Sequence, residues 1–183
     1  MSDARDNQHR RDAWRYRGGD RPSFAVTPGS AEESVWDYPR PPAYEPDRRG
    51  VTVSVDGECI AWSDHAIRAV ETGSPPAFYL PPEAMDTAFL RPSSHRTFCE
   101  WKGEAEYFDV VTDTDVIEAA VWRYPKPLPG AEAIAGWYSL YPEKLTVHVG
   151  DEPVQPQSGR YYGGWVTAEL VGPWKGEPGT GHW

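Results

Sequence analysis

Residues 51–62 read VTVSVDGECIAW, and this stretch decides the fold class. Apolar and polar residues alternate from Val51 to Val55, which is the period-two pattern of a strand with one buried face. Asp56 and Gly57 follow, and an Asp-Gly step between two strand-like runs is typical of a type I′ hairpin turn. We therefore predict two antiparallel strands, 51–55 and 58–62.

Further extended runs surround this hairpin. They are bounded by turn residues and lie at 67–71, 77–80, 97–101, 104–111, 116–124 and 144–149. The three runs between 97 and 124 predict a meander, with turns at Lys102-Gly103 and 112–115. One short helix is expected over 83–90, because Pro82 stands at its entry and Pro92 must end it.

Composition supports a mainly β fold. Nineteen Pro and seventeen Gly in 183 residues disfavour long helices, and nine Trp and ten Tyr supply apolar area, each ring roughly 150–250 Å². We expect one β domain at 34–150. A polar, flexible N-terminal arm at 1–33 precedes it, and an aromatic-rich C-terminal tail at 151–183 packs on it.

Charge and cysteine content bound the partners and the compartment. A net charge of −10 repels nucleic acid, and no apolar run approaches the roughly 20 residues that cross a membrane. Cys59 and Cys99 form no Cys-x-x-Cys pair, so we expect free thiols, no metal, no cofactor and a cytoplasmic protein. Homodimerisation stays open.

One heptapeptide pattern occurs twice. Residues 35–41 read VWDYPRP and residues 121–127 read VWRYPKP. In an extended chain the Trp and Tyr of each copy point to the same face. Two interpretations remain open: strand ends that pack on the core, or two symmetric walls of one aromatic pocket.

Several stretches resemble the domain of unknown function 427 family. They are ESVWDYPRPP at 33–42, YLP at 79–81, TFCEWKGEAEY at 97–107 and AVWRYP at 120–125. The resemblance spans roughly 33–150, and the tail segments GGW at 163–165 and VGPWKG at 171–176 resemble those of some bacterial members.

This resemblance implies a small two-sheet, β-tent-like domain whose sheets meet at an angle around a pocket, similar to the ligand-binding domain of cereblon. The sequence lacks the paired Cys-x-x-Cys zinc ligands of such relatives, which argues against a metal role. The family sometimes carries a nucleotidyltransferase label. That chemistry requires a Gly-Ser followed by spaced Asp residues for two metal ions, and this motif is missing.

Eight residues are the candidate ligand-binding site. Five rings are expected to share one cavity: Tyr79, Trp101, Tyr107, Trp122 and Tyr124. Lys102 or Glu71 would stand at its mouth, since Gly103 lets the backbone turn beside Lys102. Cys99 could be a nucleophile if a base lowered its pKa, although regular strand alternation would turn Lys102 away from it. The alternatives are a packed core cysteine, a solvent-facing lysine and an exposed strand-end glutamate.

Three functions follow from these candidates. The first, which we favour, is a module that binds a small apolar or heteroaromatic molecule between Trp and Tyr rings. The second is an interaction protein whose exposed aromatics and Pro-rich edges dock a partner chain. The third is an enzyme that uses Cys99, Lys102 or Glu71. A closed, ring-lined pocket would separate the first and third from the second.

Overall fold

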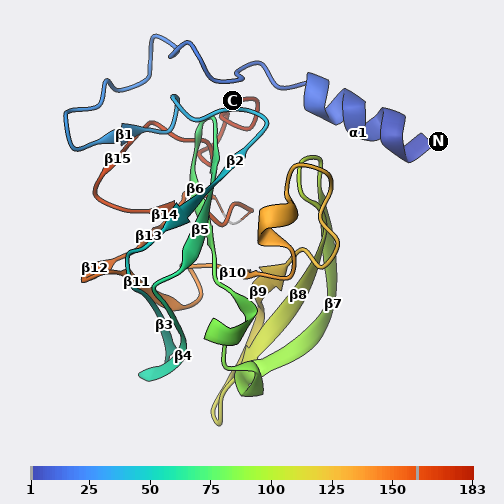
Figure 1. The fold of residues 1–183 in the computed structure, drawn as a ribbon, viewed down its shortest axis with the longest axis vertical. Helices are drawn as coiled ribbons and strands as arrows, with labels where there is room; N and C mark the ends of the chain where they lie inside the picture. The colour runs from blue at the N-terminus through green and yellow to red at the C-terminus, as the bar shows by residue number, and fades with distance from the viewer. Residues whose placement is uncertain (1, 160) are drawn as a thin grey trace.

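The computed structural model describes residues 2–159 and 161–183, apart from the side chains of 2–4. The chain is mainly β, as predicted from its sequence. Three sheets of three or four strands form the body, and two short two-stranded sheets join segments near the chain ends (Figure 1). The expected two-sheet arrangement therefore understates the number of sheets.

The first four-stranded sheet contains the predicted hairpin. Its order is β12-β11-β3-β4, with β3 at Val51–Val55, β4 at Glu58–Ser63, β11 at Thr146–Val149 and β12 at Glu152–Pro153. Asp56 and Gly57 have φ values of 51° and 85°, the left-handed conformations that a type I′ turn needs. The hairpin prediction is confirmed.

The second four-stranded sheet is the predicted meander. Its order is β10-β9-β8-β7, with β7 at Leu90–Cys99, β8 at Gly103–Val111, β9 at Val116–Arg123 and β10 at Tyr138–Leu140. Cys99 pairs with Gly103 across the β7–β8 turn, and Tyr107 pairs with Trp122 across β8 and β9. The register thus places two predicted site rings side by side.

The three-stranded sheet has the order β2-β5-β6, with β2 at Ala43–Asp47, β5 at Ala66–Glu71 and β6 at Ser74–Tyr79. The predicted strands 67–71 and 77–80 left Pro75 and Pro76 between them, in a connection, whereas both residues belong to β6. This strand is at the edge of its sheet, where a residue without an N–H is tolerated. The turn is shorter than expected and consists of Thr72 and Gly73.

The predicted helix over 83–90 is wrong. Two 3-10 turns, η1 at Pro82–Ala84 and η2 at Thr87–Phe89, occupy this segment, and Leu90 already begins β7. The Asp86 side chain accepts a hydrogen bond from the Ala88 N–H at 3.0 Å. A short polar side chain that bonds its own backbone in this way competes with helix formation.

The start of the chain contains a helix that the sequence analysis did not predict. Helix α1, Ser2–Asp12, lies at the tip of the meander (Figure 1). The Asn7 amide and the Arg11 guanidinium donate to the Glu100 carbonyl at 3.2 and 2.8 Å. The polar arm is therefore attached to the β7–β8 turn.

The C-terminal tail pairs with other segments and enters the core. Its strands are β13 at Gln155–Pro156, which pairs with β14 at Trp165–Val166, and β15 at Leu170–Val171, which pairs in parallel with β1 at Glu33–Ser34. Trp165 is fully buried, and its ring stacks on Phe78 with a centroid distance of 4.8 Å. Residues beyond 150 thus contribute to the main core.

The buried side chains form three clusters, and the two copies of the repeated heptapeptide lie in different ones. Trp122 and Tyr124 belong to an aromatic cluster on the meander, whereas Trp36 and Tyr38 pack with Val70. The hypothesis of two symmetric pocket walls is therefore wrong. The physical reason is that the first copy lies mostly in turns, and its Trp36 is enclosed by rings of the chain ends.

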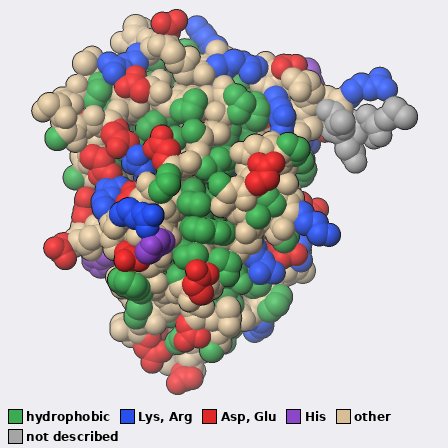
Figure 2. All heavy atoms as spheres, in the orientation of Figure 1, with side chains coloured by type: hydrophobic (Ala, Val, Ile, Leu, Met, Phe, Trp, Pro, Cys, Tyr) green, Lys and Arg blue, Asp and Glu red, His purple; other side chains and the backbone are tan. Residues whose placement is uncertain are grey.

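The surface mixes charges of both signs. Figure 2 shows acidic and basic side chains spread over one face, with a band of hydrophobic side chains down its middle. Within residues 2–159 and 161–183, no helix has both the length and the apolar character needed to span a membrane.

Candidate functional site

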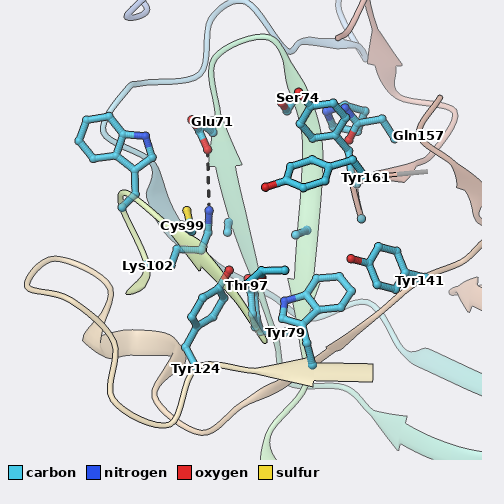
Figure 3. A pocket seen from close by; sticks show the side chains of 18 of the residues that line it. Glu71, Ser74, Tyr79, Thr97, Cys99, Lys102, Tyr124, Tyr141, Gln157 and Tyr161 are labelled. Carbon is cyan, nitrogen blue, oxygen red and sulfur yellow. Dashed lines mark ion pairs between the residues drawn. The ribbon is translucent and has the colours of Figure 1, made fainter. Parts of the chain in front are cut away.

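A cavity of about 460 Å³ lies between β5 and β6, the strands of the meander and the C-terminal tail. All eight candidate residues line it: Glu71, Tyr79, Cys99, Trp101, Lys102, Tyr107, Trp122 and Tyr124. In Figure 3, Glu71, Lys102 and Cys99 gather on one side, and Tyr141 lies on the other. The cavity therefore has a charged end and an aromatic end.

The aromatic end follows from strand register. The Tyr107 and Trp122 rings lie on neighbouring strands with centroids 6.4 Å apart, and Tyr141 approaches Trp122 at 4.6 Å. The Tyr107 and Thr97 hydroxyls share a hydrogen bond of 3.0 Å. Tyr141 and Thr97 were not among the predicted site residues.

The tail closes the aromatic end. Tyr161, Tyr162 and Gly163 all line the cavity. A Cβ added to Gly163 would lie 2.3 Å from the Trp122 Cη2 atom, so a side chain at this position does not fit. The glycine lets the tail backbone lie directly against the indole.

The β7–β8 turn carries Trp101 and Lys102 into the site. Gly103 ends this turn with φ at 101°, a conformation that favours glycine, as its sequence position suggested. Lys102 is only 9% exposed, so it lies inside the cavity rather than at its mouth. Trp101 differs from the other rings because the Arg11 guanidinium of α1 covers it at 4.8 Å.

Glu71 lies among several cations. Its Oε1 atom accepts a hydrogen bond from Arg40 Nε at 3.0 Å, and its Oε2 atom lies 3.8 Å from Lys102 Nζ (Figure 3). Burial alone would raise the pKa of Glu71, but Lys102, Lys175 and Arg40 outweigh burial and lower it. Glu71 is therefore a carboxylate at neutral pH.

Lys102 and Cys99 have the wrong protonation states for nucleophilic attack. Burial lowers the pKa of Lys102, but acidic neighbours including Cys99 and Glu71 outweigh it and raise the pKa. Burial raises the pKa of Cys99, against the opposing effect of Lys102. The thiol is therefore protonated at neutral pH, and Glu71 is the anion that holds Lys102 as an ammonium.

Lys175 was missed by the sequence analysis. It is 4% exposed, and its Nζ atom lies 4.1 Å from the centre of the Trp14 ring and 5.1 Å from that of Tyr162. Burial lowers its pKa to about 8; Glu71 and Glu100 oppose this shift, and Arg40 and Lys102 add to it. The signal that could have identified Lys175 as a site residue was its position in the segment VGPWKG, which resembles the C-terminal tails of some family members.

Trp14 was also missed. The Arg40 guanidinium lies 4.2 Å from the centre of its ring, so the ring contacts both Arg40 and Lys175. Its indole N–H donates to the Glu100 carboxylate at 2.6 Å. Aromatic rings in an otherwise polar arm, Trp14 with Tyr16 and Phe24, were the signal that it packs on the domain.

The structure also shows the state of the two cysteines and whether acidic groups gather around a metal site. Cys59 is exposed and Cys99 is partly buried, and both are free. In the part of the chain that the structure describes, no three His, Cys, Asp or Glu side chains are grouped to hold a metal ion.

Fold and site together define a small mainly β domain with a ring-lined, partly charged cavity that its sheets and its tail border and that stays open to solvent on one side. A comparison with curated proteins finds no match. The chain belongs to the family described as Domain of unknown function (DUF427), whose model matches residues 43–151. The match contains all eight predicted site residues, whereas Trp14 and Lys175 lie outside it.

Proposed function

We propose that this protein binds a small, planar aromatic or heteroaromatic molecule in the cavity. The observation that carries this proposal is the set of rings around one half-open cavity, with Trp122 in contact with both Tyr107 and Tyr141. A cavity of about 460 Å³ has the size of a small-molecule site. Ring faces attract other planar rings by offset or edge-to-face contact.

The charged end would orient the ligand. Lys102 is a fixed donor, and Glu71 is a fixed acceptor at the same end of the cavity. Binding sites commonly combine apolar walls with a few such polar groups. A ligand with its ring against Trp122 and a polar substituent toward Lys102 would use both ends.

Two Trp→Ala variants test this proposal. Trp122 lines the cavity, whereas Trp62 is 58% exposed on the hairpin and is the matched control. Binding of quinoline-2-carboxylate, measured by isothermal titration calorimetry, should weaken about fivefold in Trp122→Ala, since one ring contact contributes about 1 kcal/mol. It should be unchanged in Trp62→Ala. Equal effects of the two variants would overturn the proposal.

Native mass spectrometry of protein purified gently from its own host would identify a retained ligand directly. A co-purified aromatic molecule would support the proposal and name its class. A retained aliphatic molecule, lost from Trp122→Ala, would overturn the planar-ligand proposal.

The interaction-protein alternative has weaker support. Among the large hydrophobic residues exposed in the described part of the chain, Phe98 and Tyr161 line the cavity itself, and the others come from three further segments: Phe24 and Val26, Trp62, and Val116. A docking surface would require them to form a contiguous patch.

We further propose a reducing compartment, the cytoplasm of a bacterium. Cys59 is an exposed free thiol, which is the common state in such a compartment. The tail segments at 163–165 and 171–176, which resemble those of some bacterial members of the family, support a bacterial source. The net charge of −10 argues against a nucleic-acid partner.

A further inference from the structure

We infer that Lys175 is a carbonyl-reactive amine, which forms a reversible imine with a small aromatic aldehyde or ketone bound in the cavity. This inference rests on the proposed function, because the ring of the carbonyl compound must first occupy the aromatic end. It adds a covalent step at a residue outside the part of the chain that the family model matches.

The geometry distinguishes Lys175 from the other lysines. Lys102 is paired with Glu71, Lys144 donates to the carbonyls of Glu118 and Ala119, and Lys126 is exposed. The Lys175 side chain lines the cavity and is buried. Among the side chains that the structure describes, those of residues 5–159 and 161–183, its ammonium has neither a hydrogen-bond acceptor nor a carboxylate at ion-pair distance.

The neighbouring rings hold the amine in place. Trp14 and Tyr162 contact Lys175 Nζ through their faces, which position the nitrogen without accepting a hydrogen bond from it. Trp14 is itself held by its bond to Glu100 and by Arg40. The nitrogen lone pair is therefore free for chemistry once the proton leaves.

The surrounding charges make that proton easy to lose. Burial, Arg40 and Lys102 lower the pKa of Lys175, Glu71 and Glu100 oppose them, and the result is about 8. At pH 7.4 roughly a fifth of the Lys175 amine is then neutral, against roughly one part in a thousand for an ordinary lysine. Buried lysines beside other cations are the usual Schiff-base nucleophiles.

The step balances without any oxidant or reductant. The lone pair of the neutral amine attacks the carbonyl carbon, and the carbonyl π electrons move to oxygen, which takes a proton from water. The nitrogen loses one proton to water, which leaves a neutral carbinolamine. A second proton from water then goes to the hydroxyl, which leaves as water while the nitrogen lone pair forms the C=N bond of the protonated imine. Lys102, a fixed ammonium, can donate a hydrogen bond to the carbonyl oxygen.

The site also suits the product. A protonated imine has a positive charge on the same nitrogen, so the contacts with Trp14 and Tyr162 are retained. An imine of an aromatic aldehyde is conjugated and planar, which fits a space bounded by ring faces. The inference therefore names aromatic carbonyl compounds rather than aliphatic ones.

Reductive trapping tests this inference on the full chain. Protein is incubated at pH 7.4 with 4-pyridinecarboxaldehyde and sodium cyanoborohydride, and adducts are assigned by peptide mapping, because the α-amino group also reacts. We expect labelling of Lys175 at least tenfold faster than of Lys126, with a rate that rises as the pH approaches 8. Labelling of Lys126 and Lys144 at the same rate as Lys175 would overturn the inference.

Variants and a non-carbonyl probe separate this inference from the proposed function. Lys175→Arg should abolish the cavity adduct, and Lys126→Arg should leave it unchanged. If Lys175→Arg does not fold, mapping of the wild-type protein decides alone. If quinoline-2-carboxylate binds but 4-pyridinecarboxaldehyde forms no adduct at Lys175, the inference is overturned and the proposed function is left intact. If quinoline-2-carboxylate does not bind and no adduct forms at Lys175, the proposed function is overturned as well.

Discussion

Lys102 Nζ lies 3.8 Å from Glu71 Oε2, and this ion pair joins the tip of the meander to the end of β5. The two residues are far apart in the sequence and come from different sheets. Arg40 completes the arrangement, since it binds Glu71 as well as the carbonyls of Tyr16 and Thr72. One carboxylate thus connects the arm, the three-stranded sheet and the site.

Replacing Glu71 by Gln should destabilise the protein strongly. Two buried cations would lose their anion, and removal of one partner of a buried ion pair costs about 3–5 kcal/mol. Glu45→Gln is the matched control, because Glu45 is 49% exposed in its pair with Arg68 and its loss should cost about 1 kcal/mol or less. Urea unfolding measures both. Equal costs would contradict the prediction.

The lowered pKa of Glu71 also makes the stability of the protein depend on pH in the acid range. A carboxyl with a lower pKa in the folded state stabilises the protein above its unfolded pKa. That stabilisation is lost as the pH falls through the folded pKa. The free energy of unfolding of the wild type should therefore drop below pH 4.5, the ordinary value, more steeply than that of Glu71→Gln.

Lys175 should make the stability rise with pH in the alkaline range as well. Its pKa is about 8 when folded and 10.5 ordinarily, so between these values the unfolded state binds more protons and stability rises with pH. From pH 7 to 9.5 the wild type should gain about 2 kcal/mol relative to Lys175→Met, since one pKa unit corresponds to about 1.4 kcal/mol. The difference between the two proteins cancels the titration of tyrosines. Parallel curves would contradict the prediction.

Gly163→Ala should displace the tail from the aromatic wall. The new Cβ would lie 2.3 Å from Trp122 Cη2, and overpacking of this kind costs about 1–3 kcal/mol. Gly181→Ala is the control, because a Cβ there meets no atom within 4 Å. Gly163→Ala should lower the thermal unfolding temperature and weaken the binding of quinoline-2-carboxylate. Gly181→Ala should change neither quantity.

The two thiols should differ in reactivity. Cys59 is exposed, whereas burial raises the pKa of Cys99. Iodoacetamide at pH 7.5 should therefore modify Cys59 at least tenfold faster in the native protein, since the thiolate is the reacting form. Titration after denaturation without reductant should find two thiols, and metal analysis no zinc. A stoichiometric zinc signal would contradict our account of both cysteines.

Local patterns in the sequence predicted the strands that carry the site. Alternation and turn residues are properties of neighbouring positions, so the β3–β4 hairpin and the β7–β9 meander followed from them. The expected helix over 83–90 failed because Asp86 bonds its own backbone. Pro75 and Pro76 were misplaced because the sequence does not reveal which strand lies at a sheet edge.

Only the tertiary structure decided which residues meet. The heptapeptides at 35–41 and 121–127 are nearly identical, yet one packs among the chain ends and the other lines the cavity. Trp14 and Lys175 come from opposite ends of the chain and touch each other in the site. Burial and the charges of Arg40, Lys102, Glu71 and Glu100 set the pKa of Lys175. These surroundings are assembled by folding, so no local stretch of sequence encodes them.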